Sequence, residues 1–99
     1  MILMNLNFSW DKNKNTINKN KHKISFEEAE TAFYDERAKL IPDPDHSQNE
    51  ERFVLLGMSF NLNLLVVIHT FLEKVGVIRI ISARKATKKE SNKYNKGDE

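Results

Sequence analysis

Apolar and polar residues alternate at the start of the chain, where Leu6, Phe8 and Trp10 are separated by Asn7 and Ser9. A period of two places the three apolar side chains on one face, so this segment predicts a short strand. Three later runs rich in Val, Ile, Leu and Phe predict further strands over residues 52–58, 64–71 and 77–83. The short connections between them predict an antiparallel meander. Its middle strand, apolar on both faces, is expected at the centre of the sheet.

The polar stretch over residues 12–22 predicts a helix of a different kind. Asp11 precedes it with a side-chain oxygen suited to an N-cap. Residues four apart stack along one helical face, which here carries Lys14, Asn18 and His22. Ile17 is the only apolar side chain of the segment, so we expect it to anchor the helix to the core.

Two motifs of the form Ser/Thr-x-x-Glu predict two more helix starts. Ser25 and Glu28 form the first predicted capping box, in which each side chain accepts from the backbone amide of the other residue. The helix that follows is expected to end near Tyr34 or Asp35. Thr87 and Glu90 form the second capping box and open a short, charged C-terminal helix.

The order of these elements predicts an α+β fold, with helices packed on one face of a mainly antiparallel sheet and a short C-terminal helix. Pro42 and Pro44 exclude a helix around residues 41–46 and predict a loop there. We expect a single domain over residues 1–90 and a polar tail over residues 91–99.

Composition excludes several classes of protein. With 99 residues, the chain has no room for a nucleotide-binding domain joined to a second domain. It contains no Cys, which removes disulfides, thiolate zinc sites and a Cys nucleophile. The formal charge of +2 is small, but basic residues gather at both ends and acidic ones in the middle. The longest aliphatic run is far too short to span a membrane, so we expect a cytoplasmic protein. We also expect no cofactor.

Several motifs of this chain occur together in one protein family. They are Phe8-Ser9-Trp10-Asp11, Lys21-His22, Ser25-Phe26-Glu27-Glu28-Ala29, and Arg79-Ile80-Ile81-Ser82-Ala83-Arg84-Lys85-Ala86-Thr87 with Glu90. Through these motifs the chain resembles the BrnT toxins. The resemblance implies a RelE-like fold and a ribonuclease toxin of a type II toxin-antitoxin system. It also implies an antitoxin of the BrnA type, whose ribbon-helix-helix part contacts operator DNA.

The chain departs from the family pattern at two positions. Lys23 stands where these toxins have Gly after Lys-His, and Asn63 stands where they have a basic residue. If the backbone at Lys23 keeps the positive φ that Gly accepts, the side chain costs about 1 kcal/mol.

Cleavage of RNA without a metal needs a base, an acid and cations for the charge that develops on the phosphate. With the family in view, we expect Arg79 and Arg84 to hold the scissile phosphate, because a guanidinium donates to two oxygens at once. We expect His22, with Lys21, to assist proton transfer, since an imidazole has an unperturbed pKa of about 6.5. The remaining expected roles are substrate binding by Arg52, Lys14 and Lys85, and support by Glu51 and Glu90.

The two arginines present a geometric difficulty. They are five residues apart, an odd number, so a regular strand would place them on opposite faces. Both side chains reach one phosphate only if the strand twists or bulges near Ser82, or if Arg84 lies beyond its end. An arginine at such a place also often pairs with a neighbouring acid and has no chemical role.

Other polar and aromatic residues have simpler interpretations. We expect His69 to be a core imidazole that is satisfied by a hydroxyl or carbonyl group, and Trp10 to belong to the core. Asp43, Asp45 and His46 lie between and after two prolines and predict a solvated turn, so we expect no metal. The alternative to a ribonuclease is a module that binds RNA or protein without cleavage and acts as a corepressor with a DNA-binding partner.

Overall fold

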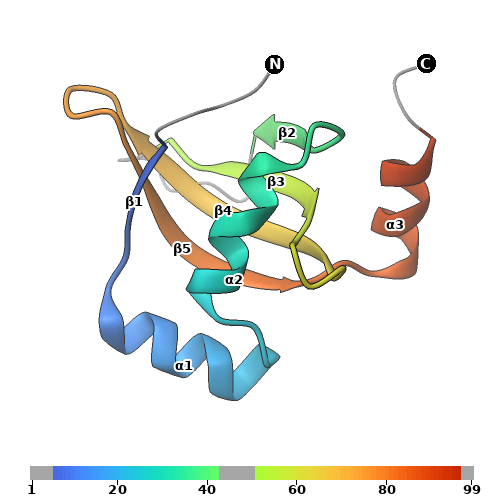
Figure 1. Ribbon diagram of the computed structural model, residues 1–99, viewed down its shortest axis with the longest axis horizontal. Coiled ribbons are helices and arrows are strands. Elements are labelled where there is room, and N and C mark those ends of the chain that lie inside the picture. Colours follow the sequence, from blue (N-terminus) through green and yellow to red (C-terminus); the bar gives the residue numbers. More distant parts are fainter. Residues whose placement is uncertain (1–5, 43–50, 97–99) are drawn as a thin grey trace.

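The sheet has five strands in the order β1-β5-β4-β3-β2 (Figure 1). The computed structural model describes residues 6–42 and 51–96. The strands are β1 (Asn7–Ser9), β2 (Lys39–Pro42), β3 (Phe53–Met58), β4 (Leu64–Leu72) and β5 (Val77–Lys85). β1 pairs with β5 in parallel, and all other pairs are antiparallel. The predicted meander and its central strand, β4, are therefore confirmed.

Strand β2 was not predicted. It pairs with β3 in the segment where the two prolines indicated a loop, and Pro42 is its last residue. Proline is compatible with an edge strand, where a missing N–H faces outward. The predicted solvated turn at Asp43, Asp45 and His46 lies outside the described residues.

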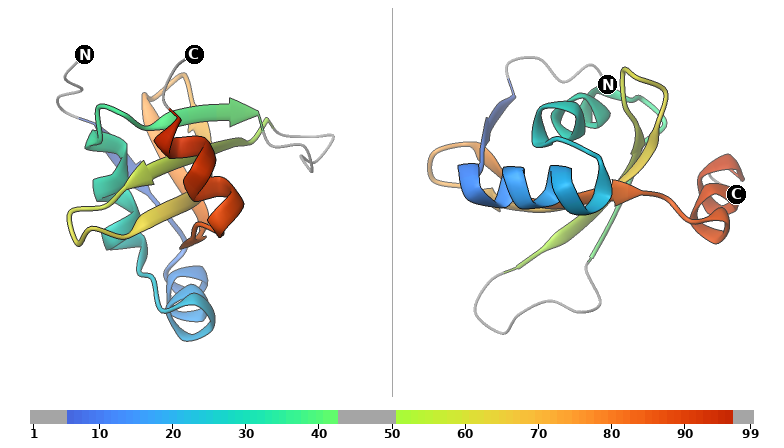
Figure 2. Two further views of the ribbon diagram at one scale, coloured as in Figure 1. Left: turned by 90° about the vertical axis from the view of Figure 1, so that its right-hand side faces the viewer. Right: turned by 90° about the horizontal axis from the view of Figure 1, so that it is seen from below.

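Three helices flank the sheet: α1 (Lys12–His22), α2 (Phe26–Thr31) and α3 (Lys88–Asn95). A 3-10 turn, η1 (Ala32–Tyr34), extends α2, so this helical segment ends at the predicted place. α2 covers one face, whereas α3 lies against residues of the other face, as the views in Figure 2 show. The α+β prediction is confirmed, but the helices do not all share one face.

The main core lies between α2 and the sheet. Its fully buried side chains include Ile24, Phe26, Leu65, Val67 and Ile80. The Trp10 ring packs edge-on against Phe26, with 6.1 Å between ring centroids, which confirms its place in the core.

His69 is the buried imidazole that the sequence predicted. It is 4% exposed, and its Nδ1 lies 3.2 Å from the carbonyl oxygen of Val67. The ring also packs edge-on against Phe33, 4.8 Å away. Burial lowers the pKa of His69 and so favours the neutral imidazole. These contacts confirm a structural role within the core.

Helix α3 covers a smaller apolar cluster on the opposite face, formed by Leu56, Val66 and Tyr94. The Tyr94 hydroxyl donates to Asp35 Oδ2 at 2.6 Å. The Thr87 and Glu90 capping box at the start of the helix is present as predicted. Residues 91–95, expected in a polar tail, instead form the second half of this packed helix.

Helix α1 is held by asparagines rather than by Ile17. Ile17 is 62% exposed, whereas Asn15 and Asn18 are buried. Asn18 accepts from the amide of Ala83 at 3.1 Å and donates to its carbonyl oxygen at 2.8 Å. It therefore pairs with the free edge of β5 much as a neighbouring strand does. The prediction for Ile17 was wrong because the buried Asn18 side chain, which bonds to the backbone of Ile24 and Ala83, outweighs one apolar side chain in setting the orientation of this helix.

The first predicted capping box is only half present. Ser25 accepts from the Glu28 amide, but the Glu28 carboxylate accepts from Ser59 Oγ at 2.7 Å and from Asn63 Nδ2 at 2.8 Å. It thus joins α2 to the β3–β4 turn instead of closing on its own helix. Asn63 therefore has a structural role, and Lys23 has the predicted positive φ, 62°.

Candidate functional site

A bulge in β5 resolves the difficulty posed by the two arginines. Ile68 of β4 pairs with Ser82, whereas the next residue, His69, pairs with Ile80. Ile81 is thus an extra residue, and the face alternation of β5 shifts by one at this point. Arg79 and Arg84 therefore lie on the same face of the sheet, the face on which α3 packs.

The regular partner strand gives the spacing of the two arginines. Arg79 pairs with Thr70 and Arg84 pairs with Val66, four residues earlier in β4. Four residues of a strand span roughly 13 Å. Ser82, paired with Ile68, lies between the two arginines on the same face. The bulge thus produces a basic row along one strand.

A second row crosses the strands at Arg79. Phe53 of β3 pairs with His69, so the register places Arg52, one residue earlier, across from Thr70. Thr70 in turn pairs with Arg79. The Thr70 side chain is 4% exposed, and its hydroxyl has no hydrogen-bond partner among the described residues. The expected substrate-binding residue Arg52, which comes immediately before β3, therefore lies near the Thr70–Arg79 pair.

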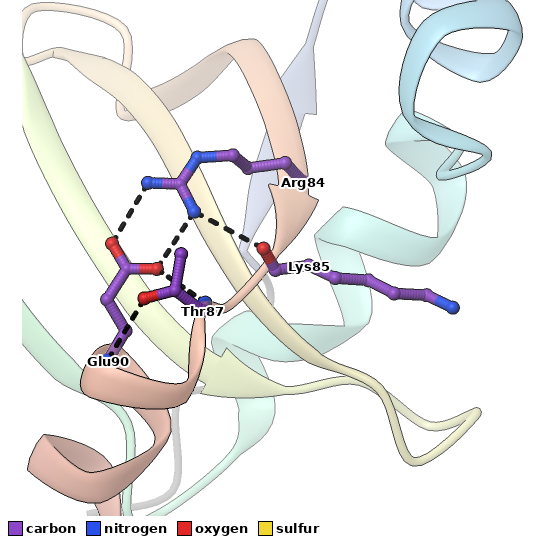
Figure 3. A network of polar contacts seen from close by, with 4 residues as sticks. All are labelled: Arg84, Lys85, Thr87 and Glu90. Carbon is purple, nitrogen blue, oxygen red and sulfur yellow. Dashed lines mark hydrogen bonds and ion pairs between the residues drawn. The ribbon is translucent and has the colours of Figure 1, made fainter.

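Arg84 is held by α3, as Figure 3 shows. Its Nη1 and Nη2 donate to the two carboxylate oxygens of Glu90 at 2.8 and 2.9 Å. Nη1 also donates to the carbonyl oxygen of Lys85 at 3.2 Å. Glu90 Oε1 accepts as well from the Thr87 amide at 2.8 Å. One carboxylate therefore fixes both the start of α3 and the orientation of a guanidinium.

The Arg84–Glu90 pair is fully charged over the working pH range. Hydrogen bonds from Arg84 lower the pKa of Glu90 to about 2. The same bonds raise the pKa of Arg84. Because the Arg84 side chain is still 41% exposed, part of its guanidinium faces solvent.

Helix α1 contributes a second group of basic residues next to the bulge. A cavity of about 200 Å³ is lined by Ile81 and Ser82 of β5 and by α1 residues Lys14, Ile17, Asn18, Lys21 and His22. Ser82 belongs both to this cavity and to the arginine row. The expected residues of α1 thus lie beside Ser82, which separates Arg79 from Arg84 along β5.

Two expected residues lie apart from this group. Lys85 pairs with the core residue Leu65, and its side chain extends away from Arg84 in Figure 3. Only its carbonyl oxygen takes part in the Arg84 network. Glu51 is exposed just before β3, and among the described residues no hydrogen bond or ion pair joins it to Arg79 or Arg84. The structure therefore does not bring these two side chains to the group around Arg84, and their expected roles stay predictions.

Thr70 and Ser82 are the two residues of this site that sequence reasoning missed. Thr70 is a polar residue within an otherwise apolar run, but its place beside Arg79 depends on pairing with a strand that follows later in the chain. The sequence indicates Ser82 only as a position near which a bulge would bring the two arginines to one face.

A larger cavity of about 470 Å³ opens on the other face of the sheet. Its lining is mainly apolar, with Phe33, Leu55 and Phe71 among the contributors, and includes no Lys or Arg. Among the described residues, no cluster of His, Asp and Glu is arranged to hold a metal ion. No described helix is long and apolar enough to cross a bilayer.

The fold is that of a ribonuclease toxin. The crystal structure of the Brucella abortus ribonuclease toxin BrnT superposes with a TM-score of 0.64 at 24% sequence identity. The match covers 84% of this chain and 99% of that one. Residues 10–90 match the family described as "Ribonuclease toxin, BrnT, of type II toxin-antitoxin system", so the chain belongs to the BrnT family. A comparison with curated proteins finds no similar sequence.

Proposed function

We propose that this protein is a metal-independent endoribonuclease whose site is the basic group around the bulge of β5. The observation that supports this most directly is the bulge itself, which brings Arg79 and Arg84 to one face. Membership of a ribonuclease toxin family supplies the reaction class. Cleavage inside RNA chains then arrests growth of the cell.

The reaction needs no group beyond the side chains of this site. The 2′-hydroxyl of the substrate loses a proton and attacks the neighbouring phosphorus, and the bond to the 5′-oxygen breaks as that oxygen gains a proton. The products are a 2′,3′-cyclic phosphate and a 5′-hydroxyl. Arg79 and Arg84 stabilise the charge on the non-bridging oxygens, because guanidinium groups keep their charge and donate in pairs.

The residues of α1 act on the protons and on the flanking backbone. His22 lines the cavity beside Ser82 and carries an imidazole, the side chain best suited to exchange protons near neutral pH. Lys21 and Lys14 line the same cavity and bind neighbouring phosphates, as Arg52 does at the other end of the row. Salt therefore weakens RNA binding by this face.

The antitoxin belongs to the same proposal. A toxin of this kind is neutralised by a partner of the BrnA type, which carries a ribbon-helix-helix domain for operator DNA. An acidic or amphipathic segment that covers the basic face neutralises it most simply. Native mass measurement after co-expression tests the complex, and RNA cleavage with and without the partner tests the occlusion. Unchanged cleavage in the complex contradicts this model.

The decisive experiment uses purified protein and a labelled RNA of mixed sequence, with and without EDTA. We expect cleavage in both, and cyclic phosphate ends on the products. Arg79→Ala and Arg84→Ala are each expected to reduce the rate at least about 100-fold. Lys74→Ala, in the exposed β4–β5 turn, is the matched control and keeps the wild-type rate. Binding of RNA without cleavage by the wild-type protein favours the module that binds without catalysis.

A further inference from the structure

The donors of Arg84 are only partly used by the contacts that hold it. A guanidinium has five N–H donors, one on Nε and two on each Nη. Nη1 uses both of its donors, one for Glu90 and one for Lys85. Nη2 uses one of its two donors for Glu90. Among the described residues, the second donor of Nη2 and the single donor of Nε have no partner.

The two remaining donors form one edge of the planar group. The N–H bonds on Nε and on the outer side of Nη2 run side by side, so together they match two oxygens of a phosphate. In Figure 3 this edge lies on the side of the guanidinium turned away from Glu90 and Lys85. The exposure of the Arg84 side chain leaves it open to a ligand. Arg84 can therefore hold Glu90 and a phosphate at the same time.

The geometry points to Glu90 as a positioning residue that holds the Nη1 and Nη2 end of Arg84, so that the Nε and Nη2 edge binds the phosphate of the RNA substrate. This inference rests on the proposed ribonuclease function and adds the residue that orients its cation. It excludes the opposite role for Glu90, that of an anion which competes with RNA for Arg84.

Charge and capping contacts explain why Glu90 suits this task. Its carboxylate is itself fixed by the amide of Thr87 at the first turn of α3. Thr87 Oγ1 in turn accepts from the Glu90 amide at 3.2 Å. The guanidinium is thus tied to a helix that packs through Tyr94 on the same sheet. An arginine held in this way needs no reorganisation when the phosphate arrives.

The two roles of Glu90 predict opposite results for Glu90→Gln. If Glu90 positions Arg84, the variant cleaves saturating RNA about tenfold or more slowly, while its affinity for uncleavable 2′-O-methyl RNA is unchanged or higher. If Glu90 competes with RNA, the variant binds more tightly and cleaves at least as fast as wild type. Equal or faster cleavage overturns the inference.

Two further variants separate positioning from helix stability and from charge. Tyr94→Phe loosens the other end of α3 and leaves the contacts among Arg84, Glu90 and Thr87, so we expect cleavage close to wild type. A loss in Tyr94→Phe as large as in Glu90→Gln overturns the inference, because loosening of α3 then explains both. Arg84→Lys keeps the charge but lacks the paired donors, and we expect it to cleave at least about tenfold more slowly.

A spectroscopic measurement tests whether the Nε and Nη2 edge of Arg84 binds RNA, and it does not depend on RNA cleavage. In the nitrogen-proton spectrum of the wild-type protein, the Arg84 Nε–H signal is expected to shift when 2′-O-methyl RNA is added, whereas that of Arg37, which stacks over Tyr94, is not. If the Arg84 signal does not shift in the RNA complex, the inference about Glu90 is overturned but the proposed function is not. A wild-type protein that neither cleaves nor binds RNA overturns the proposed function and this inference together.

Discussion

Helices α1 and α3 both attach to β5, but by opposite kinds of chemistry. α1 is held by neutral amides, since Asn18 bonds to the backbone of Ala83 and Asn15 accepts from the amide of Phe26 at 2.9 Å. α3 is held by two ionised carboxylates: Glu90 pairs with Arg84, and Asp35 accepts from the Tyr94 hydroxyl. The neutral bonds are buried, whereas the Arg84–Glu90 pair is partly exposed.

The difference indicates that α1 and α3 have different roles around the site. The contacts of Asn18 with the backbone join neutral groups and do not change with pH, so they provide a constant frame for the basic residues of α1. Asn15 also donates to the Glu27 carboxylate at 2.9 Å. Charged contacts depend on pH and respond to a nearby phosphate. The side of β5 that holds Arg84 is therefore the one on which ligand and pH effects are expected.

The largest effect is expected from Asn18→Ala. The change leaves three buried backbone groups without their partner: the amide and carbonyl of Ala83 and the carbonyl of Ile24. An unsatisfied buried group costs about 1 to 3 kcal/mol, so the free energy of unfolding should fall by about 3 kcal/mol or more. Urea unfolding measures it, with Asn20→Ala on the exposed side of α1 as control. Equal stability of the two variants contradicts the role of Asn18 in holding α1 to β5.

A smaller loss is expected from Tyr94→Phe on the α3 side. Burial raises the pKa of Asp35, but hydrogen bonds from Tyr94 and from the Met58 and Arg37 amides outweigh burial and leave it below its usual value. Removing the hydroxyl takes one donor from this carboxylate and should cost about 1 to 2 kcal/mol. Tyr34→Phe is the control in urea unfolding, because no hydrogen bond of the Tyr34 hydroxyl is found among the described residues.

The pH dependence of stability should distinguish the two helices further. The pKa of Glu90 is about 2 in the folded protein, below its ordinary value of 4.5. Its contribution is therefore complete above pH 4.5 and is lost as the pH falls toward 2. Glu90→Gln should flatten this part of the stability curve, whereas Asn18→Ala should lower the curve without changing its slope. Thermal unfolding at a series of pH values measures both.

The smallest effect is expected from Lys23→Gly, just after α1. Lys23 has a φ of 62°, which a residue with a Cβ adopts at a cost. The change should raise the free energy of unfolding by up to about 1 kcal/mol. Lys19→Gly, inside the same helix, should lower it by about 1 kcal/mol. Loss of stability in both variants would show that the Lys23 side chain contributes more than its backbone costs.

Local patterns were reliable where the partners of a residue are its neighbours in the chain. Strands β3, β4 and β5, the N-cap at Asp11 and the Thr87 capping box all follow from residues a few positions apart. Prediction failed where a distant partner competed for the same group. Glu28 bonds to the β3–β4 turn rather than to Ser25, and Ile17 is exposed because Asn18 pairs with β5.

The amino-acid sequence by itself determined most of the elements apart from β2, the family and the types of side chain available for phosphate chemistry. Only the tertiary structure decided that Arg79 and Arg84 share a face, and that Glu90 rather than Glu51 holds Arg84. The physical reason is that side chains alternate between the two faces of a regular strand, so sequence spacing alone gives the face of each residue. A bulge shifts this alternation by one residue. Whether a bulge forms depends on the register with a strand elsewhere in the chain.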